Sequence, residues 1–373
     1  THQFMNILRN RCLPVEEWPR EAFGIGERAV AFWKDWSHWL KENDLFDFTK
    51  ILEETKRLRL KPDIDCLFVD EAQDMTKLML DLTEIWGENC ETVIFVGDAD
   101  QTIFRWAGAD HKVFKDLKHD WKNELLQSYR CPKAVCEYAL KIIRRIGNRR
   151  EDVSIIPTDV EGRMFQRGIF PDLSLPGTSM IMTRCNYQLK RWISHLIQKG
   201  IPFHNPYRTE SPGWNPTATK LWSAVKTYDQ LSRGLEVRSK DLGFMMGLML
   251  VKDNMLPGIK TDRKKLLPNP YDQHEIFGLS ERGWFTPEFF QFNRPLNTLF
   301  GLTGGAGALL EAHGKEIVRV EPKVMIGTIH SFKGSEADNC FIDLTTSPTI
   351  ARAMMESQQV FGDEIRISYV AVT

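Results

Sequence analysis

Short apolar runs alternate with longer amphipathic stretches along this chain. Residues 64–69 and 93–96 are two such runs, and each leads into acidic residues. Runs of this length with polar ends are typical of parallel strands that are buried on both faces. Residues 73–86, which lie between the two runs, predict a helix. The order strand, helix, strand indicates an α/β fold with a parallel sheet.

Amphipathic helices are predicted before the first strand. Residues 27–40 carry apolar side chains at helical spacing, which we interpret as a stripe that faces the core. These side chains are Phe32, Trp33, Trp36 and Leu40. Residues 47–60 predict another helix that leads into the strand at 64–69. We place residues 10–45 in a small helical accessory lobe of the first domain.

The second half of the chain shows strands and helices on either side of a region of different character. Helices are predicted at 132–143 and 186–199, and strands at 180–182, 324–326 and 340–342. Between these, residues 206–316 contain many prolines that interrupt short helical patches, and residues 301–307 are rich in glycine. We interpret residues 206–316 as a helical insertion within the second domain.

Two carboxylates, Asp70 and Glu71, directly follow the first predicted strand. Ligands bind at the carboxyl ends of the strands in open α/β sheets. A first carboxylate there can hold Mg²⁺, and a second can orient and deprotonate a water that attacks a γ-phosphate. We therefore predict Asp70 as a metal ligand and Glu71 as a catalytic base. The alternative is a solvated acidic turn.

The second predicted strand leads to Gln101 and then to Phe104, Arg105 and Trp106. The neutral amide of Gln101 can bond a phosphate oxygen or the attacking water. In an extended segment Phe104 and Trp106 would lie on one face, where nucleic-acid bases can stack. We predict that these two rings and Arg105 bind nucleic acid. The alternative for the rings is packing in the core.

These segments resemble motifs of the superfamily 1 DNA helicases of the UvrD, Rep and PcrA type. The stretch that ends in Tyr129 and Arg130 resembles the family segment that opens a second domain. The resemblance implies that Tyr129 stacks on adenine and that Arg130 reaches the γ-phosphate. A rigid guanidinium fork suits that second role. The alternative for Arg130 is a surface ion pair of little energetic value.

Further motifs follow in the family's order. Residues 327–336 resemble the pattern Thr-Ile-His-x-x-Lys-Gly-x-Glu. The resemblance implies that Thr328 and His330 touch the DNA backbone, and that Gly334 and Glu336 belong to the nucleotide site, where Glu336 meets the ribose. A buried, satisfied histidine and an ordinary turn are the alternatives here.

The two ends of the chain also carry the resemblance. Thr1 and His2 are similar to a Thr-x-His-Ser segment that contacts single-stranded DNA, although here the Thr and His are adjacent. Residues 363–373 resemble the start of the family's last motif.

The resemblance implies an α/β protein with two RecA-like, P-loop NTPase parallel-sheet domains that bind ATP and Mg²⁺. We expect residues 1–125 to form the first domain, which is incomplete, and residues 126–205 with 317–373 to form the second. The family branch implies 3′ to 5′ movement on single-stranded DNA. We expect single-stranded DNA and duplex–single-strand junctions as partners.

No Gly-x-x-x-x-Gly-Lys-Ser/Thr loop occurs in the sequence, so the usual phosphate cradle is missing. The family pattern also expects an arginine just after Thr373. We therefore expect an internal fragment of a longer helicase that is inactive when isolated. A natural protein that never had these parts remains an alternative.

Two other functions are left open. The first is a degenerate, non-hydrolysing DNA-binding or regulatory subunit, which the missing loop favours and the retained Asp70, Glu71, Gln101 and Arg130 oppose. The second is the helicase portion of a helicase–nuclease. The sequence does not distinguish between DNA repair and DNA replication as the process.

Overall charge is nearly balanced, with 49 basic and 50 acidic residues, so nucleic-acid binding must use local patches. Candidate patches are Arg144-Arg145 with Arg149-Arg150, and Arg263 to Lys265, although short like-charge clusters of this kind are more often solvated surface than binding sites. Seven cysteines at irregular spacing predict free thiols and a reducing, cytoplasmic location. We predict no membrane partner, because no apolar stretch is long enough to span a bilayer.

Overall fold

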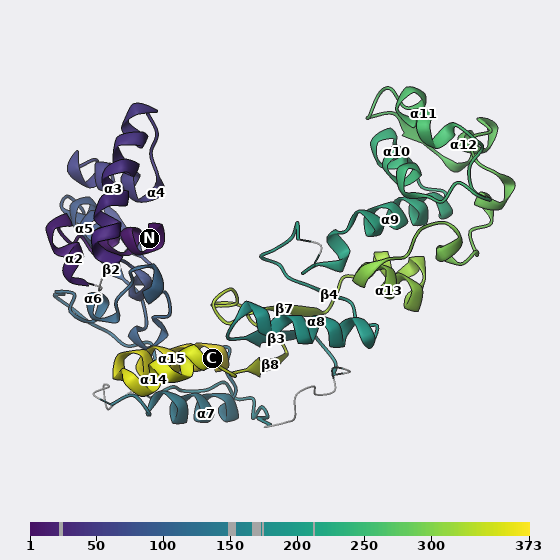
Figure 1. The fold of residues 1–373 in the computed structure, drawn as a ribbon. Helices are drawn as coiled ribbons and strands as arrows, with labels where there is room; N and C mark the ends of the chain where they lie inside the picture. The colour runs from purple at the N-terminus through teal and green to yellow at the C-terminus, as the bar shows by residue number, and fades with distance from the viewer. Residues whose placement is uncertain (22–24, 148–153, 166–172, 174, 212) are drawn as a thin grey trace. The chain divides into compact units, whose positions relative to one another are not determined.

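The structure is a computed structural model that describes residues 1–21, 25–147, 154–165, 173, 175–211 and 213–373. The chain divides into two compact units, residues 1–165 with 346–373, and residues 166–345. Figure 1 shows the elements of both. Residues 126–165 and 346–373 therefore fall in the first unit, whereas we had expected them in the second domain. The assignment of RecA-like domains stays a prediction.

The first unit contains a short parallel sheet. Strands β1 (Cys66–Val69) and β2 (Thr92–Phe95) run parallel with Val69 opposite Phe95, and helix α5 (Lys77–Gly87) connects them and contacts β1. The predicted strand, helix, strand order is confirmed. The expectation that β1 is buried on both faces is wrong, because Phe68 is 69% exposed. Among the described residues this sheet has two strands, so little of its surface is covered.

Four α-helices precede this sheet in the described part of the chain. They are α1 (His2–Asn10), α2 (Trp18–Glu21), α3 (Ile25–Glu42) and α4 (Phe48–Arg57). The predicted helices at 27–40 and 47–60 are confirmed as α3 and α4, and Asp47 caps α4 by accepting from the Lys50 backbone N–H. The stripe predicted on α3 faces the core, because Leu40 is buried and the partly buried Phe32, Trp33 and Trp36 pack against a buried cluster.

The first unit is completed, among its described residues, by two α-helices that follow β2 and two from the carboxyl-terminal end of the chain. These are α6 (His111–Lys115), α7 (Lys133–Ile143), α14 (Pro348–Glu356) and α15 (Gln358–Val372). Helices α7 and α15 pack together around Ile143, Ile365 and Tyr369. This packing places α15 in the same unit as β1 and β2.

The second unit contains a larger parallel sheet. Its four strands among the described residues have the order β4–β7–β3–β8, and all pair in parallel. They are β3 (Ser179–Thr183), β4 (Phe203–His204), β7 (Val324–Thr328) and β8 (Asn339–Asp343). Helix α8 (Leu189–Gln198) buries Leu189, Trp192 and Leu196 in the core of this sheet. The strands predicted in the second half are confirmed.

The proline-rich region between these strands is mainly helical. It contains α9 (Lys220–Ser232), α10 (Ser239–Leu248), α11 (Ile259–Leu266), α12 (Ile276–Glu281) and α13 (Gly304–His313), with a small antiparallel pair, β5 (Val237–Arg238) and β6 (Gln273–His274). Its own apolar core includes the fully buried Tyr228, Phe289 and Phe300.

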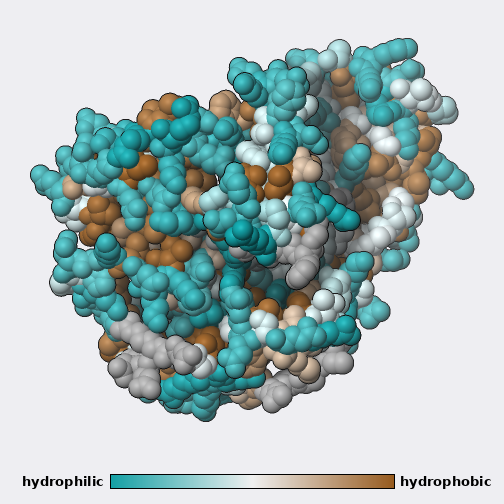
Figure 2. Space-filling model, turned by 60° about the vertical axis from the view of Figure 1, so that its left-hand side comes forward, coloured by the Kyte–Doolittle hydropathy of each residue, from teal (hydrophilic) through white to brown (hydrophobic). Residues whose placement is uncertain are grey.

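Apolar side chains also reach the surface. Figure 2 shows hydrophobic residues lying between hydrophilic ones on the face that it presents. Phe48 at the start of α4 is an example, since almost all of its side chain is exposed. Within the described ranges, no helix is both long enough and apolar enough to cross a membrane.

Candidate functional site

A tight turn follows β1 and carries the two predicted carboxylates. Glu71 adopts a left-handed backbone conformation with φ of 52°, and its N–H donates to Asp70 Oδ1 at 2.8 Å. Such a conformation is strained for a residue other than glycine and is typical of functional sites. The next residue, Ala72, donates its N–H to the carbonyl of Val96 at 2.9 Å. The turn after β1 is therefore held against the end of β2.

Gln73 joins the two strand ends through its buried side chain. Its Nε2 donates to Glu71 Oε2 at 2.6 Å, and its Oε1 accepts from the backbone N–H of Asp98 at 3.0 Å. The Thr102 hydroxyl donates to the Gln73 carbonyl at 3.3 Å. An amide suits this place because it can donate to a carboxylate and accept from an N–H at once. Sequence reasoning assigned no role to Gln73, although its position two residues after Glu71 was a usable signal.

Gln101 lies in the turn that follows β2. Its Nε2 donates to Asp98 Oδ2 at 2.9 Å, and its backbone N–H donates to the Asp98 carbonyl at 2.8 Å. Asp98 thus connects Gln101 to Gln73 and, through it, to Glu71. The structure brings Glu71 and Gln101 into one hydrogen-bonded network at the carboxyl edge of the β1–β2 sheet, while their catalytic roles stay predictions.

The carboxylate of Asp70 lies exposed at the same edge. Within the described residues, no group of three or more His, Cys, Asp or Glu side chains could hold a metal ion. A site with one carboxylate fits Mg²⁺ bound together with nucleotide phosphates, because Mg²⁺ keeps several waters and takes few protein ligands in such sites.

The aromatic segment after Gln101 is not extended, contrary to our expectation. Phe104 precedes a short 3₁₀ helix, η4 (Arg105–Ala107). Gly108 ends this helix with a φ of 106°, a conformation that glycine adopts easily. The two rings nevertheless touch, with the Phe104 and Trp106 centroids 6.2 Å apart at 61°. Trp106 is 53% exposed and can receive a base.

Arg105 points to another part of the first unit. Its Nη1 lies 3.4 Å from Asp363 Oδ2 on α15. The guanidinium that we expected to bind nucleic acid is thus engaged within the protein. Its assignment to nucleic acid stays a prediction.

Helix α1 contacts η4, and the α1 residues nearest Gly108 are Ile7 and Asn10, whereas the candidates Thr1 and His2 lie at the other end of the helix. Thr1 occupies the position before the helix, and its carbonyl accepts from the Met5 N–H at 2.9 Å. The exposed His2 ring lies nearly perpendicular to the rings of Phe32 and Trp36, at centroid distances of 5.9 and 5.8 Å.

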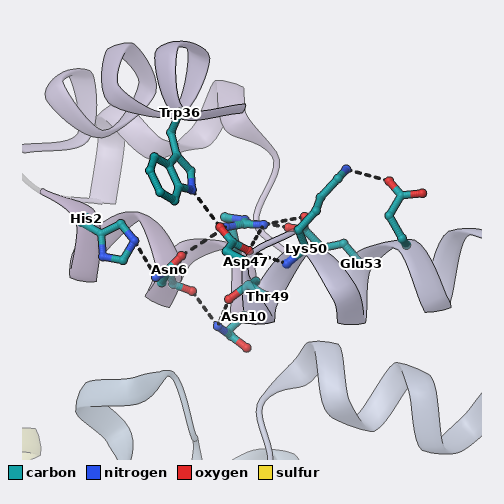
Figure 3. Close-up of polar contacts among 10 residues, drawn as sticks. His2, Asn6, Asn10, Trp36, Asp47, Thr49, Lys50 and Glu53 are labelled. Carbon is teal, nitrogen blue, oxygen red and sulfur yellow. Dashed lines mark hydrogen bonds and ion pairs between the residues drawn. The ribbon is translucent and has the colours of Figure 1, made fainter. Parts of the chain in front are cut away.

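A polar network fixes α1 against α3 and α4 (Figure 3). The buried Arg9 guanidinium donates to Asp47 and to Glu53, in each case with one bond of 2.8 Å. Trp36 donates from Nε1 to Asp47 Oδ2 at 2.8 Å. Burial alone would raise the pKa of Asp47, but the bonds from Arg9, Trp36 and the Lys50 N–H outweigh it and lower the pKa. This support for α1 was not predicted, because it joins Arg9 to residues that lie 38 and 44 positions further along the chain.

Tyr129 and Arg130 lie on an exposed stretch of the first unit. The Tyr129 ring is 90% exposed, and the Arg130 backbone N–H donates to the Ser128 hydroxyl at 3.4 Å. An exposed ring can stack on a base, as the resemblance implies for Tyr129.

The remaining candidates lie in the second unit, in the turn after β7. The Thr328 hydroxyl accepts from the Ser331 N–H at 3.3 Å, and the Thr328 N–H donates to the Ser331 hydroxyl at 3.0 Å. His330 is half-buried in this turn. Gly334 has a φ of 81°, and Glu336 is exposed. All four candidates thus lie between the last residue of β7 and the start of β8.

The basic patches give little support to a binding role. Arg145 lies over the Phe361 ring at 5.6 Å, and Arg263 donates to the Lys260 carbonyl. Arg149 and Arg150 lie outside the described residues.

Comparison with known proteins bears on the region that contains β1 and β2. Residues 15–122 match the family model of the UvrD/REP helicase N-terminal domain. Over these residues the chain is similar to DNA helicases of the UvrD/Rep/PcrA type. The Asp70-Glu71 turn, Gln73 and Gln101 all lie inside the residues that match this helicase domain.

Three relatives illustrate the similarity. The ATP-dependent DNA helicase PcrA of Bacillus subtilis is 28% identical over 156 residues, which are 38% of this chain and 21% of PcrA. The ATP-dependent DNA helicase Rep of Buchnera aphidicola is 26% identical over 203 residues, 46% of this chain and 30% of Rep. A probable DNA helicase II homolog of Mycoplasma genitalium is 32% identical over 120 residues, 28% of this chain and 17% of that protein. The chain thus spans less than a third of the length of each of these three relatives.

Proposed function

We propose that this chain works within an ATP-dependent DNA helicase or translocase that moves 3′ to 5′ on single-stranded DNA. The observation that carries the proposal is the buried Gln73 side chain, which joins Glu71 to Asp98 and thereby to Gln101. A solvated acidic turn has no need of a buried amide that orients one of its carboxylates. The similarity to PcrA and Rep supports DNA as the nucleic acid.

In this proposal Glu71 accepts the proton of the water that attacks the γ-phosphate, and Gln73 keeps its carboxylate in place. Asp70 would hold Mg²⁺, which when bound neutralises charge that develops on the phosphates. Gln101 would contact the γ-phosphate or the attacking water from the neighbouring strand end. Because Asp98 connects Gln101 to Gln73, a shift of either turn is transmitted to the other.

The other nucleotide contacts rest on the resemblance. Tyr129 would stack on adenine and Arg130 would reach the γ-phosphate, while Gly334 and Glu336 would lie near the ribose. Thr1, His2, Thr328 and His330 would contact the DNA strand, and Trp106 with Phe104 would stack on its bases. Single-stranded DNA and junctions with duplex are the proposed substrates.

The test is Glu71→Gln in the full-length protein, with Glu91→Gln as the matched control. Glu91 is an exposed glutamate just before β2, outside the proposed site. We expect Glu71→Gln to lower DNA-stimulated ATP hydrolysis by about 10²–10⁴-fold, the usual contribution of a general base. ATP binding and DNA binding should stay at the wild-type level, and Glu91→Gln should hydrolyse ATP normally.

Other outcomes separate the alternatives. Hydrolysis that is unchanged in Glu71→Gln would refute the role of Glu71 as the base. A full-length protein that binds DNA but hydrolyses no ATP would instead support the non-hydrolysing DNA-binding subunit.

A further inference from the structure

Helix α15 lies against the turn that carries Gln101 and is connected to the segment beyond it by an ion pair. It contacts the 3₁₀ helix η3 (Ala99–Gln101), and Asp363 on α15 faces Arg105, with Oδ2 and Nη1 3.4 Å apart. One helical turn further along, Arg366 Nη1 lies 3.7 Å from Asp363 Oδ1. Asp363 is thus placed between two guanidinium groups.

The side chains of Arg105, Asp363 and Arg366 are largely shielded from solvent. About three quarters of the Arg105 and Asp363 side chains and nine tenths of that of Arg366 are removed from solvent. Burial raises the pKa of Asp363, although Arg105 and Arg366 act to lower it. Burial lowers the pKa of Arg366, which Asp100 and Asp363 oppose. The ionised pair therefore pays a desolvation cost that a pair on an open surface would not.

The Arg105–Asp363 pair holds a short loop whose two ends are buried. Ile103 and Ala109 are buried on either side of the loop, and Arg105 and Trp106 lie between them. Gln359 on α15 also accepts from the Arg105 guanidinium when its amide oxygen faces that side chain. The side chain of Arg105 thus reaches back to α15 from the middle of the loop, and the next residue is the half-exposed Trp106.

We propose that Asp363 is a positioning residue that, through Arg105, sets the orientation of the Trp106 ring and thereby the affinity of this loop for single-stranded DNA. An engaged Arg105 fits this role better than direct binding of phosphate, because its guanidinium is already committed to α15. A displacement of α15 then changes strand affinity without contact between α15 and DNA. The inference rests on the proposed function in one respect, the contact of Trp106 with a base.

The test measures binding of a fluorescein-labelled oligo-dT strand to the chain by anisotropy. The variants are Asp363→Asn, Arg105→Gln, the double variant and Asp363→Glu. We expect each of the first two to weaken binding by roughly tenfold, as for coupled contacts, and the double variant to bind no more weakly than either alone. Asp363→Glu should keep most of the wild-type affinity for the strand, because it preserves the negative charge.

Two further variants distinguish positioning from general support of the fold. In a Trp106→Ala background, Asp363→Asn should have no additional effect on binding. Glu88→Gln, which removes the exposed pair of Glu88 with Arg59, is the control and should bind normally. A loss of affinity that persists in the Trp106→Ala background would overturn the inference.

The two proposals can fail separately. If Trp106→Ala weakens binding while Asp363→Asn does not, Asp363 has no positioning role and the proposed function stands. If Trp106→Ala leaves binding unchanged, or if the chain does not bind the strand at all, Trp106 is not a base contact and both ideas fail at this loop. If binding behaves as expected but the full-length protein hydrolyses no ATP, the positioning role stands alone.

Discussion

Gly97 leaves the space that the Gln73 side chain occupies. A Cβ atom at Gly97 would overlap the Gln73 amide oxygen and would lie 3.2 Å from the backbone nitrogens of Ala72 and Gln73. The absence of a side chain at one strand end therefore allows the buried amide to connect both. This close approach explains a glycine at a position whose φ is not left-handed.

Gly97→Ala should displace Gln73 and with it Glu71. We expect ATP hydrolysis by the full-length protein to fall by roughly 100-fold, as for a catalytic group misplaced by about 1 Å. Gly278→Ala is the matched control, because Gly278 has open space around it. A Gly97→Ala variant that is as active as Gly278→Ala would show that Gln73 does not hold Glu71 in its working position.

Asp47 should make the first unit sensitive to acid. Because its pKa is lowered in the folded protein, its contribution to stability is present above the ordinary aspartate pKa of about 3.9 and is lost as the pH falls through the lower folded value. Asp47→Asn removes this dependence and the charged bonds to Arg9 and Trp36, at a cost of about 2 kcal/mol at pH 7.

Urea unfolding at pH 7 and pH 3 measures both effects. The difference in the free energy of unfolding between the wild type and Asp47→Asn should be smaller at pH 3. Asp63→Asn, which alters an exposed aspartate, should leave the free energy of unfolding nearly unchanged at pH 7. An equal loss at both values of pH for Asp47→Asn would contradict the lowered pKa.

Trp106→Ala should weaken binding of single-stranded DNA by the value of one stacked base, about 1–3 kcal/mol. The matched control is Trp121→Ala, since Trp121 is 76% exposed and belongs to no proposed site. Anisotropy of a labelled oligo-dT strand gives both affinities. Equal affinities for the two variants would mean that Trp106 serves packing with Phe104 rather than contact with bases.

Tyr228 carries a buried hydroxyl that has no hydrogen-bond partner in the described part of the chain. Its burial raises its pKa to about 12, so the ring stays neutral at ordinary pH. Tyr228→Phe removes the unpaired group and should raise the free energy of unfolding by about 1 kcal/mol. Tyr271→Phe, an exposed change, serves as the control in the same urea titration. A destabilised Tyr228→Phe protein would show that the hydroxyl is bonded in solution.

The strand ends were predictable because they depend on local patterns. Val69 and Phe95 end short apolar runs, and parallel strands necessarily bring the residues after them to one edge of the sheet. The bent form of the Phe104–Trp106 segment was not predictable, since a spacing of two residues fits a turn as well as a strand. The position of Gln73 two residues after Glu71 was a usable signal, but its bond to the Asp98 N–H depends on how the two turns face each other in the fold.

Contacts between residues that are far apart in the sequence were the hardest to predict. Arg105 and Asp363 are 258 positions apart, and no single-sequence pattern connects them. The exposure of Phe68 was also missed, because an apolar run indicates what a strand would bury and not whether a neighbouring element is present to cover it.

The β1–β2 sheet has two strands among the described residues, and this affects how rigidly the turn after β1 is held. Parallel strands with few neighbours present backbone donors and acceptors that any added strand can pair with. Asp70 and Glu71 directly follow β1, so the rigidity of the turn that carries these two carboxylates depends on what pairs with the strands of this sheet. Phe68, whose side chain is 69% exposed, leaves an apolar surface on one face of the sheet, so an element that covered this face would bury apolar area and hold the turn after β1 more firmly.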